Sequence, residues 1–340
     1  MKKVPVTCPS FATVTAALDK LEAVSPADSP AGGDGGNGAM DVEGAENGDD
    51  DVPTTILPEV EVYLFNLLLT GFLRQGAISE AVTTAVTLMT RVQEFNCRSL
   101  DLLSSKFFFY FSLCFEKANT SVPGVSFSSA RPALILMYRR ACVRRDEMGQ
   151  ATLLNLLLRN YLYYDLYEQA DTLASKAPFP ESASNNQFCR YLYYMGRIAA
   201  VQLEYSDAHI KLLQASRKAP TNTAASFTVE VTQLSVIVQL LMGDIPPTST
   251  FRGDAAFVAA MAPYEALTQA VKNGDLEIFA QVAAKHADTL NDRKNLSLVQ
   301  RLQHNVLKTG LRKISISYAR ISIADVAKKL HIDSHKSMVF

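Results

Sequence analysis

Two related helical segments, 38 positions apart, constrain the fold of this chain more than any other feature. The segment Tyr167-Glu-Gln-Ala170 parallels Tyr205-Ser-Asp-Ala208 at that separation. Between Gln187 and Pro220, small and apolar residues follow the spacing of a tetratricopeptide-type repeat, namely Cys189, Gly196, Ala208, Leu212, Ala215 and Pro220. A repeat of this length is typical of stacked helical hairpins, each of which buries its apolar face on its neighbours. The sequence therefore predicts an all-α, tetratricopeptide-like solenoid whose long surfaces suit protein binding.

The same helical period extends through residues 59–250, which we interpret as the helical-repeat domain. One apolar stripe consists of Val62, Phe65, Leu69 and Phe72, and after a break at Gln75-Gly76 a second consists of Ile78, Ala81, Ala85 and Leu88. Tyrosines recur in two clusters, and we favour core packing over a recognition stripe for them: Tyr161, Tyr163, Tyr164, Tyr191, Tyr193 and Tyr194.

Residues 254–313 are predicted to form a second helical module. A turn at Asn273-Gly274-Asp275 separates its first two helices, with Gly274 in the left-handed conformation and Asp275 as the next N-cap. The third helix is expected to end at Gly310. The apolar stripes of the three helices are Tyr264, Leu267, Ala270 and Val271, then Leu276, Phe279, Val282 and Ala283, then Leu298, Val299, Leu302 and Val306.

The apolar period changes after Gly310. Ile314, Ile316 and Tyr318 alternate with serines, which predicts a half-buried strand. Ser322 followed by Asp325 predicts the capped start of another helix. Residues 314–340 therefore resemble a small winged-helix unit that is incomplete, because the chain reaches Phe340 before a wing. We expect such a strand to have too few partners, since an isolated strand pair is only marginally stable, and we interpret the chain as a truncated product or variant gene form.

The N-terminal 58 residues differ in composition from the rest of the chain. A short helix is possible within residues 1–24, where Ser10 would cap an apolar face of Val14, Ala17, Leu18 and Leu21. Residues 25–58 form an acidic, Gly- and Pro-rich linker that we expect to be disordered, because it has little to bury. Its glycines at positions 33, 35 and 38 match a dinucleotide fingerprint, but no strand or helix pattern flanks them, so we predict no nucleotide site there.

Composition and cysteine usage exclude several classes of function. The 340 residues carry a net charge of −1, so no global charge favours nucleic acid. The longest apolar runs noted, residues 62–73 and 107–115, are too short to cross a bilayer, and we predict no membrane association. Five scattered cysteines are expected to be mostly buried free thiols in a reducing compartment: Cys8, Cys97, Cys114, Cys142 and Cys189.

No pattern of catalytic residues or cofactor ligands is evident, and we predict no catalytic, cofactor or metal site. His331 and His335 share the spacing of zinc ligands but lack an intervening Glu and a third ligand. A cluster of arginines is interpreted as an exposed face rather than a docking site for acidic neighbours: Arg131, Arg139, Arg140, Arg144 and Arg145.

Five segments carry a resemblance to a known family. Residues 150–161, 190–197, 214–220, 301–312 and 314–318 resemble the subunit 3 family of non-ATPase proteins in the 26S proteasome regulatory particle. Residues 264–330 are similar to the PCI domain shared by the proteasome lid, the COP9 signalosome and a translation initiation factor complex. The resemblance covers Glu59 to Leu330.

The resemblance implies a non-catalytic scaffold of the proteasome lid, in the cytoplasm and nucleus, that supports ATP-dependent degradation of ubiquitinated proteins. Its expected partners are other PCI-domain subunits in a hetero-oligomer, joined through winged-helix sheets. The residues that would lie at that interface are Ile314, Ile316, Tyr318, Arg320, Ser322 and Asp325. Caps and strand alternation explain the same residues locally, so a purely structural role stays open.

A different class of function stays open as the alternative. Basic residues gather near the end of the chain, including Arg301, Lys308, Arg312 and Lys313, and a PCI-type adaptor could bind RNA or another PCI complex such as the signalosome or the initiation factor. We expect Arg301 and Lys308 to lie on a solvated helix face, and no stacking aromatics accompany the charge. The sequence therefore favours the protein scaffold over nucleic-acid binding.

Overall fold

The described part of the chain is helical throughout. A computed structural model describes residues 57–180, 182–220, 224–322, 325–326 and 329–330, and it contains no strand within these residues. The all-α prediction is confirmed for them. The expectations for residues 10–24 and for most of the acidic linker lie outside the described residues. The chain divides into two compact units at Leu156–Leu157, inside helix α6, and each unit is described by itself.

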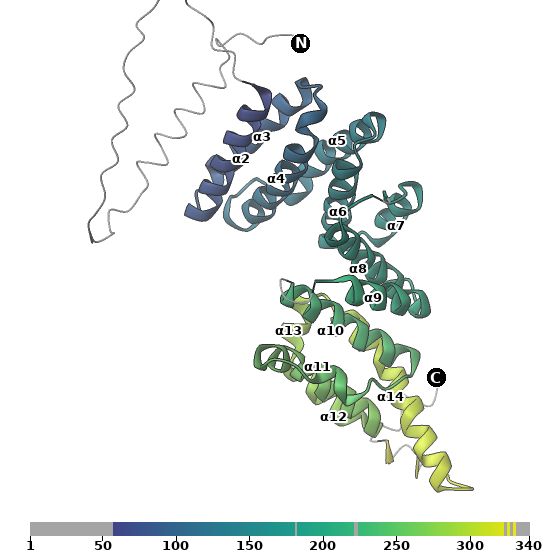
Figure 1. Ribbon diagram of the computed structural model, residues 1–340. Coiled ribbons are helices and arrows are strands. Elements are labelled where there is room, and N and C mark those ends of the chain that lie inside the picture. The colour runs from purple at the N-terminus through teal and green to yellow at the C-terminus, as the bar shows by residue number, and fades with distance from the viewer. Residues whose placement is uncertain (1–56, 181, 221–223, 323–324, 327–328, 331–340) are drawn as a thin grey trace, which may run out of the picture. The chain divides into compact units, whose positions relative to one another are not determined.

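The first unit consists of helices α2 to α5, the first part of α6 and two 3₁₀ turns (Figure 1). Their bounds are α2 Pro58–Gln75, α3 Ile78–Glu94, η1 Arg98–Leu100, α4 Asp101–Ser121, η2 Phe127–Ala130, α5 Arg131–Arg144 and α6 Glu147–Tyr163. Gly76 ends α2 with a φ of 81°, and Ala77 donates its N–H to Phe72 O, the pattern of a left-handed helix end.

The core of the first unit is built by the stripes expected from the sequence. Phe65, Leu69 and Phe72 of α2 are buried, and the small Ala81 and Ala85 of α3 are fully buried, which lets the two helices approach closely. Helix α4 adds a run of phenylalanines whose rings contact one another within the helix, the Phe111 and Phe115 centroids lying 4.8 Å apart. This core therefore combines small residues of α3 with phenylalanines of α2 and α4.

The second unit contains the rest of α6 and eight further helices, with one 3₁₀ turn, among the described residues. Their bounds are α7 Tyr167–Lys176, α8 Asn185–Val201, α9 Tyr205–Lys218, α10 Ala225–Met242, η3 Thr248–Phe251, α11 Ala255–Asn273, α12 Leu276–Lys285, α13 Ala287–Asp292 and α14 Leu296–Ser317.

The predicted repeat is confirmed in the hairpin of α8 and α9. Ala208, Leu212 and Ala215 are fully buried, and a Cβ added to Gly196 would lie 2.9 Å from Leu212 Cγ, so only glycine allows the observed crossing. The tyrosines at the two related segments, Tyr167 and Tyr205, each begin a helix, α7 and α9.

The backbone turns repeat with the same period. Asp165 and Leu203, also 38 positions apart, both have left-handed φ values, 57° and 74°. In each turn the next residue makes the equivalent backbone hydrogen bond: the N–H of Leu166 donates to Tyr161 O, and the N–H of Glu204 donates to Ala199 O. These bonds satisfy carbonyls that the ends of α6 and α8 would otherwise leave unpaired.

Helix α10 is the central helix of the second unit. By length and composition it is the one helix among the described residues that could cross a membrane, a possibility that the shorter apolar runs noted in the sequence did not reveal. Its apolar side chains pack inside the protein instead, including Val231, Val236, Ile237 and Val238 at no more than 1% exposure. Helices α9, α11 and α14 pack against it, and Figure 1 shows α10 beside them. The apolarity of α10 is therefore that of a core helix.

The tyrosine clusters mainly serve packing, as favoured from the sequence. Tyr161 is buried, Tyr191 stacks on Phe179 with centroids 4.6 Å apart, and Tyr193 contacts Phe227 at 5.8 Å. Tyr163 is the more exposed member at 37%.

The predicted strand at Ile314 to Tyr318 is wrong. Helix α14 continues to Ser317, so Ile314 and Ile316 lie in its last two turns. Five alternating residues are too few to separate a strand from a helix end by period alone. Two serines also suit the helix, because Ser315 Oγ donates to Arg312 O and Ser317 Oγ donates to Lys313 O.

Gly310, expected to end the third helix, instead allows two backbones to touch. A Cβ on Gly310 would lie 2.9 Å from Gly274 O and 2.5 Å from Leu330 Cδ2, and a Cβ on Gly274 would lie 2.7 Å from Gly310 Cα. Gly274 has the predicted left-handed φ of 73°, and Asp275 occupies the N-cap position of α12, although its side chain makes no capping bond. Gly310 is therefore a packing glycine inside α14 rather than a helix stop.

Candidate protein-interaction site

The base of α14 is held by polar side chains that reach the ends of earlier helices. Arg301 Nη1 donates to Val201 O at the end of α8 (2.9 Å), and Asn305 Nδ2 donates to Leu240 O and Leu241 O at the end of α10 (2.8 and 2.7 Å). Carbonyls in the last turn of a helix lack the usual partner within that helix, and these bonds supply further donors to them; Leu240 O also accepts from Gly243 N. The interpretation of Arg301 as solvated is therefore wrong, whereas Lys308 is exposed as expected.

Lys294, just before α14, makes a third connection of the same kind. Its Nζ donates to Leu162 O (3.2 Å) and Tyr163 O at the end of α6, and it pairs with Asp165 Oδ1 at 3.0 Å. The ends of α6, α8 and α10 are thus capped in chain order by Lys294, Arg301 and Asn305. We call these three residues the capping ladder.

Arg197 of α8 hydrogen-bonds the backbone at Lys294, the first residue of the capping ladder. It donates to Arg293 O (2.8 Å) and Lys294 O (3.0 Å), and its Nη1 also donates to Tyr193 Oη at 3.3 Å. Burial raises the pKa of Tyr193, so its hydroxyl stays neutral at physiological pH and remains a hydrogen-bond partner. This network could not be predicted from the sequence. The position of an arginine or asparagine along a helix does not indicate which distant carbonyl its side chain will bind.

The far end of α14 is exposed. Ile316 is 85% exposed, and Leu311 and Tyr318 follow at 46% and 43%. Lys329 Nζ lies 4.0 Å from the centroid of the Tyr318 ring, a cation–π contact that holds the segment after α14 against the helix end. These exposed apolar side chains leave the end of α14 accessible to another protein, although single exposed apolar residues are common on protein surfaces.

The six residues predicted as a partner interface lie in sequence along this end of α14 and the turn after it. Ile314 is half-buried, and the other five are exposed, namely Ile316, Tyr318, Arg320, Ser322 and Asp325. They lie at the end of a helix and in the segment that follows it, not in the sheet that was predicted. The capping pair is confirmed, because Ser322 Oγ accepts from Asp325 N (3.2 Å) and donates to Asp325 Oδ2 (2.7 Å).

The charge of this region is mostly positive. Exposed cations are frequent in this part of the sequence, namely Lys308, Arg312, Lys313, Arg320 and Lys329, and Asp325 is an exposed carboxylate within it. Lys313 Nζ donates to Asn273 O at 3.2 Å, which ties α14 to the end of α11. An exposed apolar residue among basic residues can bind an apolar and acidic protein surface.

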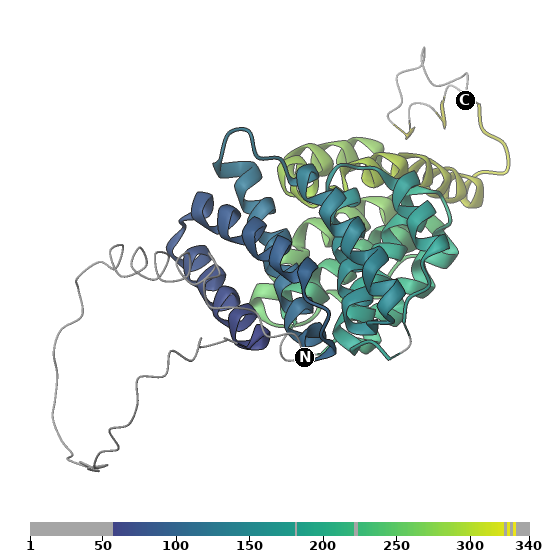
Figure 2. The ribbon, with the colours of Figure 1, turned by 90° about the horizontal axis from the view of Figure 1, so that it is seen from above.

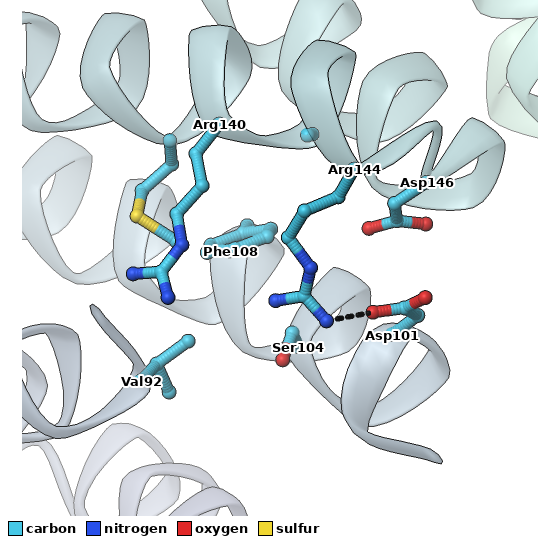
Figure 3. A pocket seen from close by; sticks show the side chains of 9 residues that line it. Val92, Asp101, Ser104, Phe108, Arg140, Arg144 and Asp146 are labelled. Atoms are coloured by element: carbon cyan, nitrogen blue, oxygen red, sulfur yellow. Dashed lines mark hydrogen bonds and ion pairs between the residues drawn. The ribbon is translucent and has the colours of Figure 1, made fainter. Parts of the chain in front are cut away.

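Two arginines of the cluster on α5 are not free surface residues, so that part of the exposed-face interpretation is wrong. Arg140 donates to Gln93 O and, at 3.0 Å, to Phe95 O, and Arg144 pairs with Asp101 Oδ1 at 3.0 Å. Figure 3 shows Arg144 pointing to Asp101 with Asp146 beside them. They connect α5 to α4 and to the end of α3.

The cavity beside these arginines is too small for a ligand. Its volume is about 20 Å³, which holds one water molecule. Burial raises the pKa of Asp146, against the opposing effect of Gly149 N–H, which donates to its Oδ1 at 2.9 Å. The arrangement is that of an N-cap for α6.

The described residues contain no group of three potential metal ligands. His331 and His335 lie outside the described part of the chain. Cys97, Cys114, Cys142 and Cys189 are free thiols, of which Cys114 and Cys189 are buried and Cys142 is exposed, contrary to the expectation of burial.

Comparison with known proteins is consistent with this architecture. A family model described as PSMD3-like, N-terminal TPR repeats, matches residues 12–268, and a PCI domain model matches residues 283–339. A probable 26S proteasome non-ATPase regulatory subunit 3 of Nicotiana tabacum is 45% identical over 295 residues, which are 87% of this chain and 59% of that protein. The corresponding subunit of Dictyostelium discoideum is 46% identical over 275 residues, 81% of this chain and 53% of that protein.

A probable subunit of the same name in Drosophila melanogaster is 44% identical over 285 residues, 84% of this chain and 56% of that protein. The chain thus spans between half and two thirds of the length of these curated relatives. The repeats and the PCI domain occur in the order expected from the sequence. Because the repeat model covers more than half of its residues, the chain belongs to the PSMD3-like family.

Proposed function

We propose that this protein is a non-catalytic scaffold subunit of the 26S proteasome regulatory particle. In this role it would join other PCI-domain subunits of the lid in a hetero-oligomer and support the degradation of ubiquitinated proteins, in the cytoplasm and nucleus. The observation that carries the proposal is the presence, in one chain, of both the PSMD3-like repeats and the PCI domain. The names of the relatives, non-ATPase regulatory subunits of the proteasome, favour this role over an RNA-binding or signalosome adaptor.

We further propose that the exposed end of α14 and the turn after it form the partner interface. The interface would consist of Ile314, Ile316, Tyr318, Arg320, Ser322 and Asp325. Its support is the 85% exposure of Ile316 and the basic residues beside it, which suit an apolar and acidic surface on a neighbouring subunit. The capping ladder holds the base of the same helix, so its exposed end is presented on a fixed support.

The test uses tagged full chains expressed in cells, native electrophoresis of the extract and mass spectrometry of the proteins that migrate with the tag. The unmodified chain is expected to co-migrate with the regulatory particle. Ile316→Asp places a charge on an exposed side chain, so it should leave folding intact and reduce co-migration at least about tenfold, as expected for an apolar residue at the centre of an interface.

The matched control is Ile210→Asp on α9. Ile210 is 53% exposed and also belongs to the second unit, but it lies on a different helix from Ile316. The control therefore makes the same change in charge outside the proposed interface. Equal co-migration of the two variants and the unmodified chain would refute the α14 interface. Migration of the unmodified chain with another PCI complex, or with RNA in a strongly salt-dependent manner, would refute the proteasome role.

A further inference from the structure

Helix α2 has an apolar face that no described residue covers. From its start to Leu67, every exposed residue of α2 is apolar: Val60, Tyr63 and Leu67 are 45%, 52% and 51% exposed. Leu57, just before the helix, is 65% exposed. Spacings of three and four residues place these side chains on one face of the helix. We call these four residues the α2 outer face.

The exposed face of the neighbouring helix α3 is mainly polar, unlike that of α2. The exposed residues of α3 are mainly hydroxyl-bearing or charged, namely Ser79, Thr83, Thr87, Thr90 and Glu94, with Val86 as the apolar exception. The opposite side of α2 is already buried through Val62, Phe65 and Leu69. A helix that is apolar on both sides is one that belongs between two partners. In Figures 1 and 2, α2 lies at the edge of the described part of its unit.

We propose that residues 10–24 of the same chain cover the α2 outer face. These residues lie outside the described part, and their sequence places Val14, Ala17, Leu18 and Leu21 on one side of an expected helix. The match to the family of N-terminal repeats begins at residue 12, so this segment belongs with the repeats although it precedes α2 by more than 30 residues. A helical repeat array needs a terminal helix that shields its first apolar face.

The intervening chain is long enough for this contact. Residues 25–56 have a glycine- and acid-rich composition, and a coil of that length has a root-mean-square span of about 30 Å. Helix α2 is 18 residues long, about 27 Å, so a segment tethered in this way can return along the whole helix. Tethering also keeps the segment at a high effective concentration, on the order of millimolar, which favours it over free competitors.

The experiment measures how fast a thiol on the α2 outer face reacts with a maleimide in the full chain. The background carries Cys8→Ser, Cys97→Ser and Cys142→Ser, and the probe is Val60→Cys. The matched probe is Val86→Cys on α3, because Val86 is 46% exposed against 45% for Val60. The probe at position 60 is expected to react about tenfold more slowly than that at position 86, the ratio for a face covered about 90% of the time.

Adding Leu18→Asp and Leu21→Asp should bring the reaction at position 60 to the rate at position 86, with an unchanged helical circular dichroism signal. Equal rates at both positions before the aspartates are added would refute the proposal. Protection that survives the aspartates would also refute it, and protection that rises with protein concentration would assign the face to a second copy of the chain.

Discussion

At the scale of single residues, the contact between Gly274 and Gly310 sets how closely α14 approaches the turn between α11 and α12. We predict that Gly310→Ala destabilises the second unit by about 1–3 kcal/mol, since the added methyl would meet Gly274 O and Leu330 and the backbones would have to separate. Thermal or urea unfolding followed by circular dichroism measures the change. Lys308→Ala, on the exposed side of the same helix, is the control and should alter stability by less than about 0.5 kcal/mol. A neutral Gly310→Ala would show that the contact has no energetic role.

The free thiols are expected to differ strongly in reactivity. Burial raises the pKa of Cys114 to about 12, so its thiolate is essentially absent at pH 8, whereas the exposed Cys142 is accessible to reagent. Brief iodoacetamide treatment of the folded chain, followed by peptide mass spectrometry, should modify Cys142 and leave Cys114 unmodified. In denaturant both should react. Modification of Cys114 at a comparable rate without denaturant would contradict the burial of α4.

At the scale of elements, α14 is helical through Ser317, whereas the alternation of Ile314, Ile316 and Tyr318 with serines suggested a strand. We predict that Arg312→Pro costs about 3 kcal/mol, because proline removes a backbone donor inside the helix and clashes with the preceding turn. Ala319→Pro should be tolerated, because Ala319 follows the helix and Tyr318 already has the extended angles, φ −131° and ψ 122°, that precede proline readily. Unfolding midpoints of the two variants test this. Equal tolerance of both prolines would mean that the helix ends before Arg312.

At the scale of the whole molecule, the capping ladder joins repeat helices to the helices matched by the PCI domain. Loss of Arg301 and Asn305 together removes three hydrogen bonds at the ends of α8 and α10, about 0.5–1.5 kcal/mol each. We predict that Arg301→Ala with Asn305→Ala accelerates hydrogen exchange in α8, α10 and α14 together and leaves α2 to α4 unchanged. Mass spectrometry of exchanged peptides measures it, with Gln303→Ala and His304→Ala as the exposed control pair. Faster exchange in α14 alone would mean that these helices open independently.

The boundary between compact units also belongs to this scale. It falls within α6, between Leu156 and Leu157, whereas the family matches divide the chain after residue 268. The difference has a physical cause, because hydrogen bonds from Lys294, Arg301 and Asn305 to α6, α8 and α10 cross the sequence boundary. A division made by sequence family therefore does not coincide with a division made by packing.

The sequence by itself determined the class of fold and the repeat. Helical periodicity is a local property, and the stripes at Phe65 and Leu69, at Ala81 and Ala85, and at the Gly196 crossing were readable because each helix must bury one side. The Ser322–Asp325 cap was readable for a similar reason, since both partners lie within one helical turn. The resemblance to the family likewise rested on continuous stretches of sequence.

Only the tertiary structure decided the features that depend on distant residues. From the sequence, Gly310 was expected to end a helix. Its actual role depends on Gly274, 36 positions away, whose backbone leaves no room for a side chain at position 310. Arg301 looked solvated, because the carbonyl that it satisfies belongs to Val201, 100 positions away. The candidate interface likewise changed from a strand to a helix end, because a short alternating run has no preference of its own and takes its conformation from the helix that precedes it.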